Sequence, residues 1–417
     1  MGSQVQSEMI HGFGKKDPMK SNLKPAEVYD LASIELNLFN LAHTLPAMRL
    51  EGARLDPGTP IYDPSGEVLF YRIPLRDESG GSLGYADIAA NTLFGSPLLA
   101  TAPDSTWDAD AWIAKAQTAL ECLRHERNYD QKKLSDYDEV RLVAFSFPKL
   151  AVQFLANGKE VIMLELATWA VVPSASPKRK AMEPGSFERW SLIKEMPARK
   201  KRSAHKHFEE RAKLIDRIKP RSVADANVIS RNNLSVWESI LRFRDTRELH
   251  YSTRSSDHYD CYELRGQETN VWCVAASVQM VLDFYRYEYT QSRIAQALNL
   301  GTLQNPNGLP YANDNDVAVQ LNALSSGALS AQMLTTPAFS SYVTEIRANR
   351  PLVSFIPGHS RTVAGYTQSI FVIFGGSGFR GLLVYDPWPP NVGVITRWEN
   401  FDTQTYRRAF TAQVATI

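Results

Sequence analysis

Residues 267–285, QETNVWCVAASVQMVLDFY, place a cysteine where a polar loop meets an apolar helix. From Val274 onward, apolar residues recur every three or four positions, which predicts a helix with one buried face. Cys273 then lies at or near the helix N-terminus, where unpaired amides and the helix dipole stabilise an anion. Because the thiolate is the reactive form of cysteine, this position favours a nucleophile, although a cysteine packed in the core is the simpler alternative.

A thiolate nucleophile needs an imidazole partner, and of the eight histidines only His359 follows Cys273. It lies in residues 351–367, PLVSFIPGHSRTVAGYT, which predict a strand, a Pro-Gly turn and a second strand. A histidine at the start of a strand is a rigidly held base. His250 and His258 precede the cysteine in a polar stretch and rank below it as candidates.

The base in turn needs a group that fixes its tautomer, and Asp386 closes the apolar strand predicted in residues 381–390, GLLVYDPWPP. An Asp-Pro pair often does no more than end a strand, so this assignment depends on its position one strand after His359. Gln267 lies six residues before Cys273. Its side-chain amide and the Cys273 backbone amide are predicted to donate to an oxyanion.

Three local patterns, Q-x5-C, G-H-S-x-x-V-x-G-Y and Y-D-P-W, resemble those of papain-like cysteine peptidases. The compact bacterial branch, which includes staphopain, streptopain and the leader peptidases of bacteriocin exporters, is the most similar. The resemblance covers about residues 255–417. It implies a helix that carries the nucleophile, packed against an antiparallel β-sheet that carries the base, with the active site between them.

The resemblance also implies a role for each matching residue. Cys273 would be the nucleophile, His359 the general acid and base, Asp386 the orienting carboxylate and Gln267 the oxyanion donor. Trp388 resembles the tryptophan that shields the orienting hydrogen bond in this family. The implied partner is a peptide or protein substrate, with no cofactor and no metal.

Two positions beside the nucleophile depart from papain. Asn270 stands where papain has a cysteine, and Val274 stands where papain has a tryptophan. These departures affect the neighbouring substrate subsites rather than the three catalytic positions. The sequence therefore leaves the substrate preference open.

Lysine usage divides the chain, because all 17 lysines lie at or before Lys219. We expect three parts: an α+β domain over residues 1–175, a basic linker containing a helix and a cleavage site over 176–250, and a peptidase domain over 251–417. The overall fold class is α+β, with an antiparallel sheet in each domain.

Two helix-hairpin units are predicted in the first domain. Their helices are expected at residues 25–44 and 106–126, and their strands at 66–75, 82–91 and within 150–169. Asn157-Gly158 is a hairpin turn signal. Cys122 is expected on the apolar, core side of the second helix.

Residues 178–221 hold 15 Lys and Arg against 6 Asp and Glu, a run more typical of a solvated linker than of a nucleic-acid surface. A helix ended by Pro220 is predicted within residues 202–220. Zymogens of the streptopain and staphopain type have a similar plan. The resemblance therefore implies that residues 1 to about 220 inhibit or chaperone the peptidase, and that cleavage within 198–255 releases it.

Composition excludes several other classes of protein. A formal net charge of +1 argues against a nucleic-acid or membrane-surface protein, and no window reaches the roughly 18 apolar residues of a membrane span. The first 20 residues contain no apolar signal region, so a cytosolic location is expected, with secretion left open. Three cysteines do not make a disulfide framework or a zinc site, although a Cys261–Cys273 bridge stays open. The acidic run at 313–316 lacks the spacing of a calcium loop.

Two other functions compete with peptide hydrolysis. A transglutaminase or deamidase uses a similar Cys, His and Asp set to transfer an acyl group from glutamine. A catalytically inactive papain-like scaffold would instead bind a partner through its N-terminal domain. Rapid alkylation of Cys273 would argue against the inactive scaffold, because a thiolate reacts much faster than a buried thiol.

Overall fold

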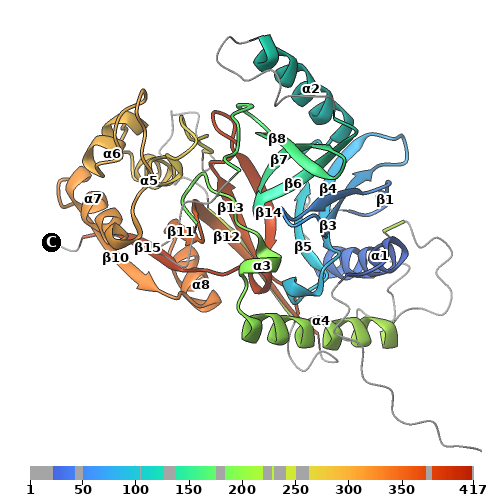
Figure 1. Cartoon of the computed structure of the whole chain (residues 1–417). Coiled ribbons are helices and arrows are strands. Elements are labelled where there is room, and N and C mark those ends of the chain that lie inside the picture. The colour runs from blue at the N-terminus through green and yellow to red at the C-terminus, as the bar shows by residue number, and fades with distance from the viewer. Residues whose placement is uncertain are drawn as a thin grey trace, which may run out of the picture.

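Figure 1 shows the chain as a computed structural model. The structure describes residues 22–42, 50–103, 105–125, 137–174, 184–218, 228–229, 241–249, 263–371 and 378–415. Within these ranges, no helix combines the length and the apolar character needed to cross a bilayer.

Among the described residues, one sheet of 15 strands runs through both halves of the chain, in the order β10-β15-β11-β12-β13-β14-β5-β4-β3-β2-β6-β7-β8, with β1 added to β3 and β9 added to β12. The N-terminal strands are β1 Arg54–Leu55, β2 Thr59–Tyr62, β3 Val68–Arg76, β4 Ser82–Ala89, β5 Leu98–Pro103, β6 Glu139–Ser146, β7 Lys149–Ala156 and β8 Lys159–Glu165. The later strands are β9 Leu241–Glu248, β10 Leu329–Thr335, β11 Leu352–Ile356, β12 His359–Phe371, β13 Arg380–Asp386, β14 Val394–Asn400 and β15 Arg408–Val414. Of these ladders, only β2 with β6 is parallel, so the predicted antiparallel character is confirmed.

The two halves meet where β14 pairs with β5. The Thr101 hydroxyl donates to the Arg397 carbonyl over 2.6 Å, and the Asn400 amide donates to the Leu98 carbonyl over 2.7 Å. A buried cluster also spans the junction, with Ile88 of β4 and side chains of β13 in the same core. The N-terminal half is therefore hydrogen-bonded into the sheet that carries the later strands. The domain boundaries at 175 and 250 stay predictions.

The C-terminal helices lie at one end of the sheet, on the left in Figure 1. They are α5 Cys273–Phe284, α6 Gln291–Ala297 and α7 Asp316–Leu324, with the short helix η5 Tyr311–Asn313 before α7 and α8 Phe339–Arg347 nearby. The apolar face of α5 buries Val278, Val281 and Leu282 against a core that includes Val353 of β11 and Phe410 of β15. This packing confirms the predicted helix and its buried face, and it fixes the helix start against the sheet.

The N-terminal half carries α1 Pro25–Ala42, α2 Ala109–His125, α3 Leu192–Glu195, α4 Ala198–Ile218 and the short helix η2 Thr92–Phe94. Figure 1 shows α4 along the lower edge, below α1. The helix predicted within 202–220 is confirmed and begins earlier, at Ala198. Its Phe208 and Ile215 are buried, and Arg211 pairs with the buried Glu35 over 2.8 Å. Much of the basic run is thus a helix packed on the N-terminal half.

The other local predictions hold at similar precision. The structure contains the predicted helix from Pro25, the predicted hairpin of β3 and β4, and the predicted hairpin of β7 and β8. Asn157 and Gly158 have φ values of 50° and 71°, the left-handed turn geometry that this pair favours.

The prediction that Cys122 lies in the core is wrong, because its thiol is exposed. The buried side of α2 carries Ala116 and Leu120. A residue two positions after Leu120 is rotated by about 200° around a helix of 3.6 residues per turn, so it faces away from that side.

Candidate active site

Cys273 is the first residue of α5, and its side chain is buried. The preceding Trp272 is fully buried and donates its indole N–H to the Leu300 carbonyl over 2.9 Å. A large aromatic anchor directly before the cysteine fixes where the helix begins. The thiol therefore has one defined position at the positive end of the helix.

His359 begins β12, directly after the turn at Gly358. Gly358 has a φ of 67°, and a Cβ atom there would lie 2.8 Å from Cγ of Pro184, so only glycine fits. Asp386 ends β13, which pairs with β12. The strand, turn and strand predicted around His359 are confirmed.

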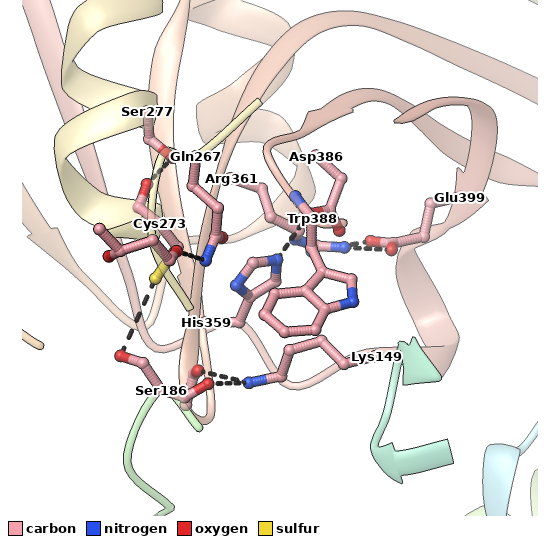
Figure 2. A network of polar contacts seen from close by, with 12 residues as sticks. Lys149, Ser186, Gln267, Cys273, Ser277, His359, Arg361, Asp386, Trp388 and Glu399 are labelled. Carbon is pink, nitrogen blue, oxygen red and sulfur yellow. Dashed lines mark hydrogen bonds and ion pairs between the residues drawn. The ribbon is translucent and has the colours of Figure 1, made fainter. Parts of the chain in front are cut away.

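These side chains meet in one buried cluster, shown in Figure 2. His359 Nε2 lies 2.6 Å from Asp386 Oδ1, and the Trp388 backbone N–H donates to the same oxygen over 2.8 Å. Because an ionised carboxylate only accepts, Nε2 carries a proton, which leaves Nδ1 to interact with the Cys273 thiol. Figure 2 shows this second ring nitrogen on the Cys273 side. The structure thus brings together all three residues of the predicted catalytic set.

Electrostatics in the cluster favour a thiolate and an imidazolium. Burial alone raises the pKa of the Cys273 thiol. The hydrogen bond and charge of His359, the charge of Lys149 and the Ser360 backbone N–H outweigh burial and lower it. Burial alone lowers the pKa of His359, but the charge and hydrogen bond of Asp386, followed by those of Cys273, raise it. Each partner stabilises the charged form of the other.

These opposite shifts predict how Cys273 titrates. The ultraviolet thiolate absorbance of wild type minus that of Cys273→Ala should rise through an inflection below pH 9.0, the ordinary value for a thiol. His359→Gln should move the inflection upward, because it removes the hydrogen bond and the positive charge that stabilise the thiolate. An inflection that is the same in both proteins would contradict the ion pair.

Gln267 lies in the loop before α5, and its side chain is buried. Its Nε2 donates to the Thr269 carbonyl over 2.6 Å, while its Oε1 has no hydrogen-bond partner among the described residues. The Gln267 backbone bonds to Pro387 and Asn391 over 3.0 and 2.8 Å, which ties this loop to the segment after Asp386. One Nε2 hydrogen is occupied and the other is available, so oxyanion donation by Gln267 stays a prediction.

Trp388 is buried, and its ring lies beside Phe145 and Phe187, with centroids 5.9 and 6.1 Å away. Both phenylalanines come from the N-terminal half. The shielding role of Trp388 stays a prediction. The residue does join the N-terminal half to the segment that holds Asp386.

Sequence reasoning missed Lys149, which is fully buried at the start of β7. Its ammonium donates to the carbonyls of Ser186 and Gly358 over 2.6 and 3.1 Å, so it bridges the N-terminal half and the turn before His359. Burial lowers the pKa of Lys149 to about 8, although the charges of Cys273, Asp386 and nearby glutamates oppose this shift. A lysine before an apolar strand is a common pattern, and it carried no signal of this placement.

The structure also places residues 184–188, here called the strap, over Cys273. Ser186 Oγ lies 4.0 Å from Cys273 Sγ (Figure 2), and the Tyr311 hydroxyl donates to the Pro184 carbonyl. A cavity of only about 40 Å³ remains beside the thiol, and its walls include the strap and His359. That space suits one or two water molecules and is too small for a peptide.

A buried ion pair supports the strand that carries His359. Arg361, two residues later on β12, makes a bidentate contact with Glu399 of β14, and the Tyr406 hydroxyl donates to the same carboxylate over 2.7 Å. Both charges are almost fully buried, so removing one partner would leave the other uncompensated. This pair holds β12 in register next to the catalytic set.

The described residues contain no group of three or more His, Cys, Asp or Glu side chains that could hold a metal ion. The Cys273 thiol is free, whereas Cys261, His250 and His258 lie outside the described residues.

Residues 259–413 match the model of the Peptidase_C39 like family, a family of papain-like cysteine peptidases. The match supports cysteine peptidase activity in this part of the chain. It agrees with the predicted papain-like region at residues 255–417, although the staphopain or streptopain type is not established. No curated protein matches the chain.

Two solved structures are similar over 37% of the chain. One is the peptidase domain of Streptococcus ComA, a bifunctional ABC transporter involved in quorum sensing, with 17% identity, 99% of that chain covered and a TM-score of 0.25. The other is a double glycine motif protease from an AMS/PCAT transporter in complex with the leader peptide, with 14% identity, 94% covered and a TM-score of 0.24.

Proposed function

We propose that this protein is a cysteine endopeptidase, made as a zymogen, that hydrolyses peptide bonds through a thioester. The observation that carries the proposal is the Cys273 thiol beside an imidazole that is itself held by a buried carboxylate at 2.6 Å. A nucleophile, a base and an orienting group in contact are the parts that acyl transfer needs.

The first half of the reaction forms the acyl-enzyme. The Cys273 thiolate attacks the peptide carbonyl carbon, a C–S bond forms, and the carbonyl electron pair moves to oxygen. The remaining Nε2 hydrogen of Gln267, together with the Cys273 backbone amide, would stabilise that oxyanion. When the C–N bond breaks, the His359 imidazolium gives its proton to the departing amine.

The second half releases the acid. His359, now neutral, takes a proton from water as the oxygen attacks the thioester carbonyl carbon. The C–S bond then breaks, and the electron pair returns to sulfur as the thiolate. Asp386 holds the same imidazole tautomer in both halves and stabilises the imidazolium.

We further propose that the strap holds the enzyme latent until the chain is cut. Three contacts support this: the Tyr311 hydroxyl on Pro184, the Lys149 ammonium on Ser186, and the Ser186 hydroxyl beside the thiol. A substrate backbone needs the space that the strap fills. Cleavage is proposed to fall within 198–255 but not in α4 or β9, because hydrogen-bonded helices and strands resist proteases.

The competing functions are not favoured. The family match is to peptidases, which argues against a transglutaminase or deamidase. A buried thiol whose pKa is lowered by a neighbouring imidazole is unusual for an inactive scaffold.

Loosening the strap tests this function. Tyr311→Phe removes the hydroxyl that donates to the Pro184 carbonyl and accepts from the Gly358 backbone N–H over 3.1 Å, and it keeps the ring under Arg407. Since one hydrogen bond contributes about 1 kcal/mol, labelling of Cys273 by an epoxysuccinyl peptide inhibitor should become about fivefold faster than in wild type. The rate is read by intact-mass spectrometry of the full chain.

Tyr289→Phe is the matched control, because it removes a hydroxyl that binds the Leu324 carbonyl, a contact that does not involve the strap. Its labelling rate should equal that of wild type. Equal labelling rates for wild type and Tyr311→Phe would contradict the proposal that the strap restricts access to Cys273. If Cys273 does not react at all in either wild type or Tyr311→Phe, the proposed peptidase activity is contradicted.

A further inference from the structure

A second, much larger cavity lies on the far side of the catalytic carboxylate. Its volume is about 530 Å³, and its walls come from β3, β4, β5, α2 and the segment 386–399. Asp386 and Trp388 belong to its wall, whereas Cys273 and His359 do not. Drug-sized ligands occupy cavities of roughly 300–1,000 Å³, often between two structural units. This cavity has that size and that location.

Aromatic rings dominate the wall. They include Tyr85, Trp107, Trp112, Phe147, Trp169 and Trp388. The Trp112 and Trp169 centroids are 6.2 Å apart, and the two rings are tilted by 50°. Flat apolar rings are attracted to such surfaces by stacking and edge-to-face contacts. The wall therefore favours a planar aromatic body over a hydrated sugar or a peptide backbone.

The described charged side chains of the wall form ion pairs with one another or with neighbours, except for Lys115 at the outer edge of the cavity, here called the rim. Arg72 makes two hydrogen bonds of 2.8 Å to Asp87, so this pair is neutral overall. Asp386 is paired with His359, and Glu399 is paired with Arg361.

Lys115 is different, because it is exposed on α2 and, among the described residues, contacts only the Trp112 ring, at 5.0 Å. An anionic group on a ligand would complement it.

An unused donor in the wall also suggests a ligand with acceptor atoms. The Trp388 indole nitrogen is buried and has no hydrogen-bond partner among the described residues. Figure 2 shows that it points away from His359. Buried donors are rarely left unpaired.

We propose that this cavity binds a small planar aromatic anion, with its rings against the wall that Trp112 and Trp169 form and its charged group near Lys115. The inference does not depend on the proposed peptidase activity, because binding is measured without turnover. It adds a ligand site that shares Asp386 and Trp388 with the catalytic region.

Anilinonaphthalene sulfonate, a fluorescent aromatic anion, is a direct probe for the full-length protein. It should bind with a stoichiometry of one and with enhanced emission. Lys115→Glu reverses the rim charge and should weaken binding about fivefold. The neutral analogue phenylnaphthylamine should lose less than about twofold in the same variant, because it has no charge to pair. Trp112→Ala should weaken both dyes about tenfold through loss of ring contact.

Lys200→Glu is the matched control, since it makes the same charge change at an exposed site on α4. It should leave both affinities unchanged, and all variants should keep the thermal midpoint of wild type to within a few degrees. The proposal is overturned if Lys115→Glu weakens both dyes equally, if Trp112→Ala changes neither, or if dye binding does not saturate at one site.

Discussion

Replacing Cys273 by alanine is expected to abolish both peptide hydrolysis and self-processing. The sulfur is the atom that becomes acylated, and no other described thiol lies near His359, because Cys122 is exposed on α2. Removing the nucleophile of a comparable catalytic set lowers kcat by about 10⁶, which is below detection in a stopped assay. Intact-mass analysis of wild type and variant after incubation in reductant would show loss of an N-terminal fragment from wild type alone.

Cys122→Ser is the matched control, because it removes a thiol without touching the catalytic cluster. It should process like wild type. Processing of Cys273→Ala at the wild-type rate would rule out Cys273 as the nucleophile. If wild type also stays near 46.8 kDa, the self-processing proposal fails, and epoxysuccinyl labelling then decides separately whether the peptidase proposal survives.

Replacing Asp386 by alanine should give the second large loss, about 10²–10⁴ in kcat, with a smaller change in KM. Asp386 accepts from His359 Nε2 at 2.6 Å, so its loss frees the ring to rotate and to change tautomer. The pKa of His359 should also fall, because the Asp386 charge is what raises it most. The upper limb of the pH profile, where the His359 imidazolium loses its proton, would then move to lower pH.

Asp386→Asn separates orientation from charge. Asparagine keeps an acceptor oxygen but not the negative charge, so its activity should fall between those of wild type and Asp386→Ala. Asp402→Asn is the control, because it changes an exposed carboxylate that pairs with Arg380. It should leave kcat and KM unchanged. Equal activity of wild type and Asp386→Ala would remove Asp386 from the mechanism. The thermal midpoint of each variant distinguishes this loss from unfolding.

Local patterns were sufficient to predict the helix and strands that carry the candidate residues, whereas other elements, including β10, β14 and β15, were not predicted. The apolar period after Val274 predicted α5, and the Pro-Gly turn before His359 predicted the hairpin of β11 and β12. These features depend on neighbours within one or two turns of helix or one hairpin. The prediction for Cys122 failed, because Cys122 lies about 200° around α2 from Leu120 and so faces away from the buried side.

The sequence by itself determined which Cys, His and Asp residues are the candidates, because together they occur in the order and the local contexts of papain-like peptidases; the role of Gln267 stays a prediction. The tertiary structure alone placed Lys149 beside the turn of Gly358, across a separation of 209 residues. It alone placed the strap over the thiol and opened the aromatic cavity behind Trp388. Contacts between distant segments depend on how the sheet of one half joins that of the other, and no local period of side chains encodes that pairing.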